Sequence, residues 1–135
     1  TEITKLFENL NVQDLIFFGD YNRNWISKFT EERNDKKPLI EAIDYFKKHK
    51  VTNRFKGALN VKDKELSEFI KHFYILTRVD GDFCYYHFLD EQQNILGIIH
   101  YSGEVRFQIL TKKTNELFLT AINKTDFKFI KDNAN

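Results

Sequence analysis

The fold of this chain is decided by residues 80–109, which read DGDFCYYHFLDEQQNILGIIHYSGEVRFQI. Residues 105–109 alternate apolar and polar side chains, the pattern of a half-buried strand. Phe83–Leu89 and Ile95–Tyr101 are short and rich in aromatic or β-branched residues, as strands are. Asp-Gly and Ser-Gly pairs in this stretch can supply the positive φ angles of tight hairpin turns. We therefore expect consecutive antiparallel strands here.

Downstream of this stretch, Glu116–Ile122 and Phe127–Phe129 read as further strands because they are short, apolar and separated by polar connectors. Upstream, apolar residues recur at helical spacing, most clearly in Leu39–Phe46, and Pro38 suits the first turn of that helix. The segment Val12–Phe18 fits either a helix or a buried strand.

These patterns predict the α+β class, with N-terminal helices packed on a C-terminal antiparallel β-meander of five or six strands. The helical part covers about residues 1–73 and the sheet about residues 74–131. A length of 135 residues predicts one domain, residues 1–135.

Composition excludes several classes. Twenty-one of the 135 residues are aromatic, which gives enough apolar surface to exclude a disordered chain. No apolar run reaches the roughly 18 residues that a membrane span needs. The single cysteine, Cys84, and an N-terminus without a signal-peptide pattern lead us to expect a cytoplasmic protein. The high content of Lys, Asn, Ile and Phe resembles that of proteins from AT-rich bacterial genomes.

The formal charge of +1 hides two unlike segments. Residues 47–56 hold five Lys or Arg and no carboxylate, whereas residues 79–105 hold five carboxylates and no Lys or Arg. The basic run follows a predicted helix, where cations favour the helix dipole, and the whole chain lacks the basic excess typical of nucleic-acid binders. We therefore expect no nucleic-acid partner.

The acidic segment has two interpretations. Hairpin tips are commonly solvated and polar, which explains the acids without any function. Alternatively, the 80–82 and 102–103 turns share one end of the meander and form an acidic surface that docks on a basic protein, with nearby tyrosines as anchors. The candidate partner-binding residues are Asp80, Asp82, Tyr85, Tyr86, Asp90, Glu91, Tyr101 and Glu104.

Catalytic motifs are missing from the sequence: it contains no P-loop, no G-x-S-x-G and no H-E-x-x-H. Neither a metal site nor a cofactor is indicated, and we expect no enzymatic activity. One alternative is a small ribonuclease-like enzyme, because His87 and His100 could lie close across paired strands and act as base and acid. The simpler interpretation is that both histidines fill half-buried sheet positions.

The function that these features favour is a protein-binding module. Its most concrete form is an immunity protein, an inhibitor that neutralises a bacterial toxin, such as a basic nuclease, through acidic hairpins and tyrosines. The order of elements and the length also resemble folds similar to nuclear transport factor 2, which would imply a ligand-binding cone lined by Phe and Tyr. Phe127–Ile130, as an edge strand, could instead pair two copies into a homodimer.

Overall fold

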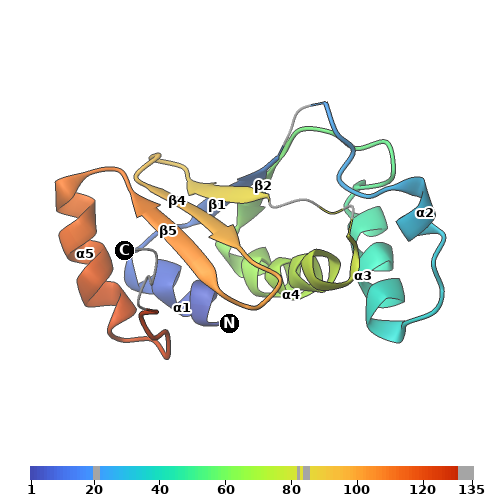
Figure 1. Cartoon of the computed structure of the whole chain (residues 1–135). Coiled ribbons are helices and arrows are strands. Elements are labelled where there is room, and N and C mark those ends of the chain that lie inside the picture. The colour runs from blue at the N-terminus through green and yellow to red at the C-terminus, as the bar shows by residue number, and fades with distance from the viewer. Residues whose placement is uncertain (20–21, 82, 84–85, 131–135) are drawn as a thin grey trace, which may run out of the picture.

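The computed structural model describes residues 1–19, 22–81, 83 and 86–130 (Figure 1). The helices are α1 (Glu2–Asn9), α2 (Lys28–Glu31), α3 (Lys37–Lys48), α4 (Asp63–Val79) and α5 (Lys112–Ile122). The strands are β1 (Asp14–Phe18), β2 (Ala58–Lys62), β3 (His87–Asp90), β4 (Ile95–Ile99) and β5 (Val105–Ile109).

The five strands form one antiparallel sheet in the order β2-β1-β3-β4-β5. The predicted α+β class is confirmed. The C-terminal meander supplies only β3, β4 and β5, and the other two strands come from the N-terminal half. The ambiguous segment Val12–Phe18 contains β1, which lies inside the sheet between β2 and β3.

The prediction that Glu116–Ile122 is a strand is wrong, because this stretch is the second half of α5. Thr111 caps the helix by accepting a hydrogen bond from the backbone N–H of Thr114. Phe118, Ala121 and Ile122 are buried, and their spacing of three and four residues is helical.

The predicted strand at Phe127–Phe129, and the edge strand Phe127–Ile130 built on it, are also wrong: residues 127–130 are an irregular segment. Two of its side chains stay largely in solvent, since Phe129 is 72% and Ile130 70% exposed. An alternating pattern gives a strand only where its backbone pairs with a neighbouring strand, and no described strand pairs with this segment. The strands at the two edges of the sheet are β2 and β5.

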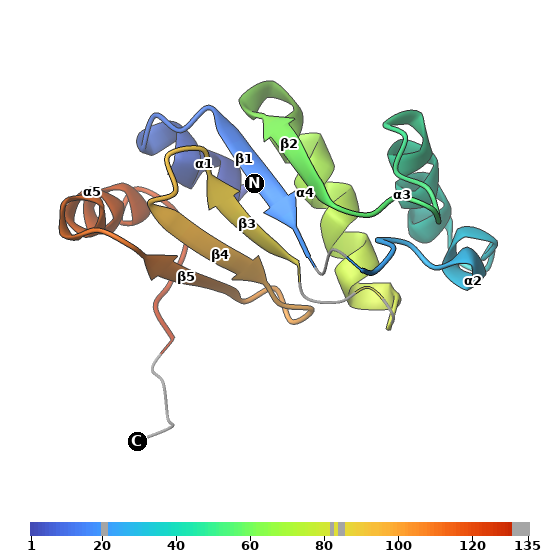
Figure 2. The same cartoon turned by 90° about the horizontal axis from the view of Figure 1, so that it is seen from above.

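Two helices, α1 and α4, cover one face of the sheet and pass behind the strands in Figure 2. The inward side chains form an aromatic core in which the ring of Phe17 lies 4.6 Å from Phe69, 5.1 Å from Phe73 and 5.6 Å from Phe88. Trp25 extends this core, because it stacks on Tyr86 at 4.6 Å and donates a hydrogen bond to the carbonyl of Gly57. Edge-to-face and stacked pairs of this kind add to the stability from apolar burial.

None of the helices in the described part of the chain is long and apolar enough to cross a membrane.

Candidate protein-binding surface

Asp90, one of the predicted partner-binding acids, is buried and 3% exposed. Its Oδ1 accepts hydrogen bonds from the backbone N–H groups of Asn94 and Ile95, both at 2.7 Å. A carboxylate in this position closes the turn between β3 and β4 by satisfying N–H groups that the ladder leaves over. Asp90 therefore has a structural role in the hairpin.

Asp80 and Tyr86 are buried as well, at 4% and 2% exposed. Asp80 ends α4, and its carbonyl accepts a hydrogen bond from the N–H of Phe83. Tyr86 lies in the core against Trp25. Their burial leaves neither side chain available to a partner.

The other predicted residues are spread over the molecule. Asp82 and Tyr85 lie outside the described residues, as does Cys84. Glu91 is exposed in the β3–β4 turn, whereas Tyr101 and Glu104 lie in the β4–β5 turn at the opposite end of the strands. Of the described residues in the predicted acidic surface, Tyr101 and Glu104 are brought together in accessible positions, and the others are not.

The two histidines lie on the same side of the sheet. His87 pairs with Ile98, and His100 follows two residues later, so strand alternation places both on the face without helices. The contacts of each are with other residues: His87 stacks on Phe18 at 5.8 Å, and His100 Nδ1 lies 2.8 Å from Ser102 Oγ. No group of His, Cys, Asp or Glu within the described residues is suited to hold a metal ion.

The surface that stands out was not predicted from the sequence. Of the seven large apolar side chains that are exposed among the described residues, six lie on or beside β5, α5 and the segment after α5. They are Tyr101, Leu110, Leu117, Leu119, Phe129 and Ile130. Scattered apolar residues are common on protein surfaces, but a gathering at one end indicates an interaction site. We call these six residues the β5 surface.

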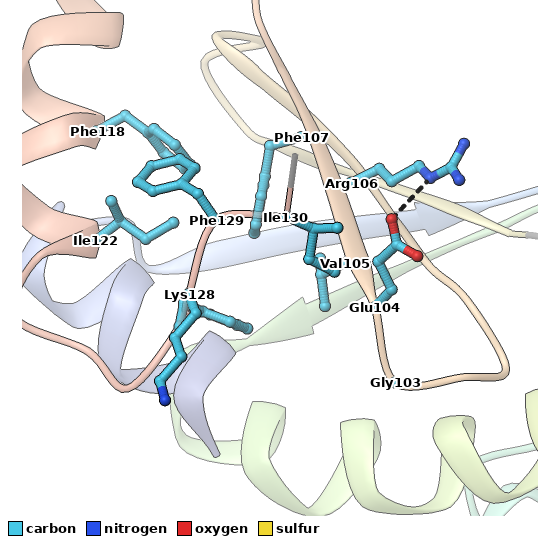
Figure 3. A pocket seen from close by; sticks show the side chains of 11 residues that line it. Gly103, Glu104, Val105, Arg106, Phe107, Phe118, Ile122, Lys128, Phe129 and Ile130 are labelled. Carbon is cyan, nitrogen blue, oxygen red and sulfur yellow. Dashed lines mark hydrogen bonds and ion pairs between the residues drawn. The ribbon is translucent and has the colours of Figure 1, made fainter. Parts of the chain in front are cut away.

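A pocket with a volume of about 660 Å³ lies next to these residues (Figure 3). Its apolar wall contains Phe107 of β5, Phe118 of α5 and Phe129 of the C-terminal segment. Glu104 and Arg106, which form an ion pair at 3.4 Å, stand on the other side of β5. A second, more apolar hollow of about 470 Å³ shares the lining residues Gly103, Val105 and Phe127 with the first, so the two are neighbours.

The segment after α5 is held in place by α1. A carboxylate oxygen of Glu2 accepts a hydrogen bond from the N–H of Asp126 at 2.6 Å, and the hydroxyl of Thr125 donates to the carbonyl of Ile122. The hydrogen bond from Asp126, and then that from Lys5, hold the pKa of Glu2 below its ordinary value. Phe127 consequently packs edge-on to Phe107, at 6.2 Å between ring centres, and closes the bottom of the pocket.

The basic segment forms the end of α3 and the loop after it. Lys47 and Lys48 occupy the last turn of the helix, as the sequence predicts, where they favour its dipole. Lys47 also pairs with Glu31 at 3.7 Å. This segment lies far along the sheet from the β5 surface, next to α2 (Figure 2).

Comparison of the chain with protein-family models, with curated proteins and with solved structures finds no match. Within the geometry of the described residues, an unpaired edge strand flanked by exposed apolar side chains is the strongest feature. A sequence signal for it exists in Leu117 and Leu119, which stand on the exposed side of a helix whose buried residues are Phe118, Ala121 and Ile122.

Proposed function

We propose that this protein is a binding module that docks a partner protein on the β5 surface and carries out no catalysis itself. One observation carries the proposal: six of the seven exposed large apolar side chains of the described residues belong to the β4–β5 turn, to α5 or to the segments that follow β5 and α5, and no described strand covers the outer edge of β5. Aromatic and aliphatic residues around a hollow are typical of the few residues that dominate binding energy at protein interfaces.

Phe129 is the first anchor to consider. Its side chain is 72% exposed and lines the pocket together with Phe107 and Phe118. Most of its apolar surface therefore remains in contact with solvent. Burying it against a partner would release about 1.5–3 kcal/mol.

The immunity-protein form of the proposal is narrower, and one observation favours it. Tyr101 is 54% exposed and Glu104 lines the pocket, so an aromatic anchor and a carboxylate stand together in the β4–β5 turn. In this form the partner is a bacterial toxin domain, and the protein inhibits it by covering its active surface. Inhibition requires a complex tight enough to survive dilution in the cell.

The experiment is site-specific photo-crosslinking in the cells that make the protein. A photoreactive phenylalanine replaces Phe129 or Leu117 in two variants, and replaces exposed Glu41 of α3 in a control. We expect one protein species to crosslink from positions 129 and 117 and not from position 41, followed by its identification by mass spectrometry. Equal crosslinking from position 41, or no product from positions 129 and 117, contradicts the proposal.

The identified partner then permits a quantitative measurement. Phe129→Asp should weaken binding by at least about 30-fold, the effect of a typical interface anchor, without changing the thermal midpoint of the free protein. Glu41→Lys is the matched control and should change neither value. If the partner is a toxin domain, an equimolar amount of this protein should abolish its activity, and Tyr101→Ala with Glu104→Lys should restore that activity. A toxin that stays active in the complex would contradict the inhibitor form alone.

A further inference from the structure

The backbone of β5 has a defined outer edge. The carbonyl of Glu104 accepts a hydrogen bond from the N–H of His100, and the N–H of Leu110 donates one to the carbonyl of Asn94. The backbone N–H and C=O groups of the even-numbered residues of β5 therefore point toward β4. Strand geometry alternates, and the N–H and C=O groups of Val105, Phe107 and Ile109 therefore point away from the sheet. No described strand pairs with them. Three residues with outward groups at strand spacing fit the backbone of another extended chain.

The side chains of the same three residues point toward the helical side, and those of Val105 and Phe107 form part of the pocket wall. Phe107 lies 5.1 Å from Phe118 and 6.2 Å from Phe127, measured between ring centres. A strand added along β5 would turn every second side chain to this side, next to Phe129 and Ile130. These alternate side chains would be apolar, since they complete an apolar wall.

The charge of Arg106 indicates which side chains an added strand would carry on the face away from the pocket. Arg106 lies on the face without helices, and its side chain is 71% exposed. Residues 104–130 contain five Lys or Arg and three carboxylates, a net charge of +2 for the part of the chain that holds β5, α5 and the segment after it. A carboxylate directly opposite Arg106 on an added strand would form a favourable cross-strand pair.

We infer that the occupant of this site is an extended segment of the partner protein that adds a sixth strand to β5. Its alternate residues are apolar and face the pocket, and a residue of its other face is Asp or Glu, opposite Arg106. This inference rests on the proposed function and specifies how the partner is recognised. The main-chain hydrogen bonds supply affinity and the alternating side chains supply specificity.

A second copy of this chain fits the edge less well. If two β5 strands paired about a two-fold axis at Phe107, Arg106 would face Gln108, and an axis at Arg106 would bring two arginines together. An axis at Val105 would pair Glu104 with Arg106, but the overlap would then end at Gly103, whose φ of 89° is not extended. Self-pairing of β5 therefore either lacks the charge match or is very short.

The probe for this inference is a phage-displayed library of random linear peptides, selected on the immobilised protein and counter-selected on Phe129→Asp. We expect the enriched peptides to alternate apolar and other residues and to contain Asp or Glu at one of the intervening positions. Arg106→Glu used as bait should change the enriched intervening residue to Lys or Arg. Enriched peptides without alternation, or a charge preference that ignores Arg106→Glu, overturn the inference.

Backbone pairing has its own test on a synthetic enriched peptide. N-methylation of every second residue removes the hydrogen bonds of one strand edge, and methylation of the intervening residues removes those of the other. One of the two sets should weaken binding by about tenfold or more, while the other set has a much smaller effect. Equal affinities for both sets contradict strand addition.

The outcomes separate the two proposals. A partner that depends on Phe129 in the crosslinking experiment, together with peptides insensitive to N-methylation, leaves the binding function in place and overturns only the strand. Absence of any Phe129-dependent partner overturns both. A stable dimer of the parent protein that dissociates in Phe129→Asp would assign the site to a second copy and overturn the inference.

Discussion

The two edge strands of the sheet differ in how they meet solvent. Along β2 the exposed positions are Ala58, Asn60 and Lys62, and Asn60 donates a hydrogen bond to Asp14 of the neighbouring strand. Along β5 the exposed positions are Arg106 and Gln108, but the exposed apolar residues Leu110, Phe129 and Ile130 follow β5 or lie in the segment after α5. Polar and charged side chains on an edge discourage pairing with other chains, whereas apolar ones invite it. The two edges therefore differ less in their own side chains than in the apolar residues that accompany β5.

The largest effect that we expect on the β5 side comes from Asp90→Ala. The change removes the carboxylate that accepts the N–H groups of Asn94 and Ile95, and it should lower the free energy of unfolding by about 3 kcal/mol. Urea unfolding measures this value. Glu91, the neighbouring exposed acid, provides the control: Glu91→Ala should change the free energy of unfolding by less than about 0.5 kcal/mol. Similar losses in both variants would contradict the structural role of Asp90.

The next largest effect is expected from Gly97→Ala, which should destabilise β4 and β5 more than β2. Gly97 of β4 lies under the ring of Phe88, and an added Cβ would come within 2.2 Å of that ring. Overpacking of this kind costs about 2 kcal/mol, and hydrogen exchange should accelerate more at the amides of β4 and β5 than at those of β2. Gly81→Ala is the matched control, because its Cβ would meet nothing within 4 Å. Uniform acceleration over the whole sheet would show that the edges are not independent.

At low pH, the segment after α5 should be the first part near β5 to lose stability. The pKa of Glu2 is lowered by the hydrogen bond from the N–H of Asp126. The stabilisation from this carboxylate is therefore complete above its ordinary pKa of 4.5 and is lost as the pH falls through the lowered pKa of the folded state. The amide resonance of Asp126 should follow this titration in the parent protein and not in Glu2→Gln. Glu8→Gln, on the same helix, should leave the titration unchanged.

The smallest effect is expected at high pH, where the packing of α3 on α4 should lose stability. Tyr45 of α3 stacks on His72 of α4, and burial, followed by Glu65 and Glu68, raises its pKa to about 12. The folded state thus holds this proton more tightly than the unfolded state, so stability falls as the pH rises from 10 toward 12. Unfolding midpoints of Tyr45→Phe should lack this decline. Tyr101→Phe, an exposed tyrosine, should retain the full decline of the parent.

Much of the fold follows from local sequence, and α5 shows where local sequence fails. The Ser-Gly turn and the alternation after it are enough to predict the β4–β5 hairpin. In α5, Leu117, Phe118 and Leu119 are consecutive and apolar, which reads as a strand. Only the contact of Phe118 with Phe107 determines which of the three is buried. Tertiary packing overrides the local pattern here.

The candidate site was harder to predict than the fold. Asp90 shares the inward side of β3 with Phe88, so strict alternation would have placed it inside, but its acidic character suggested a solvated tip. The exposure of Phe129 cannot be read from the sequence, since alternating Phe residues are more often core. It depends on the course that Glu2 imposes on the segment after α5.

The hydrogen bond between Glu2 and Asp126 also makes the path of the chain nearly a closed ring. Joining these two regions by a short linker would complete the ring, and the chain could then be opened in the exposed turn at Gln92. The rearranged protein would still carry β3 and β4 side by side, because the ladder from His87 to Leu89 and the core beneath it hold them. Circular permutation should thus leave the fold of the sheet and its helices intact.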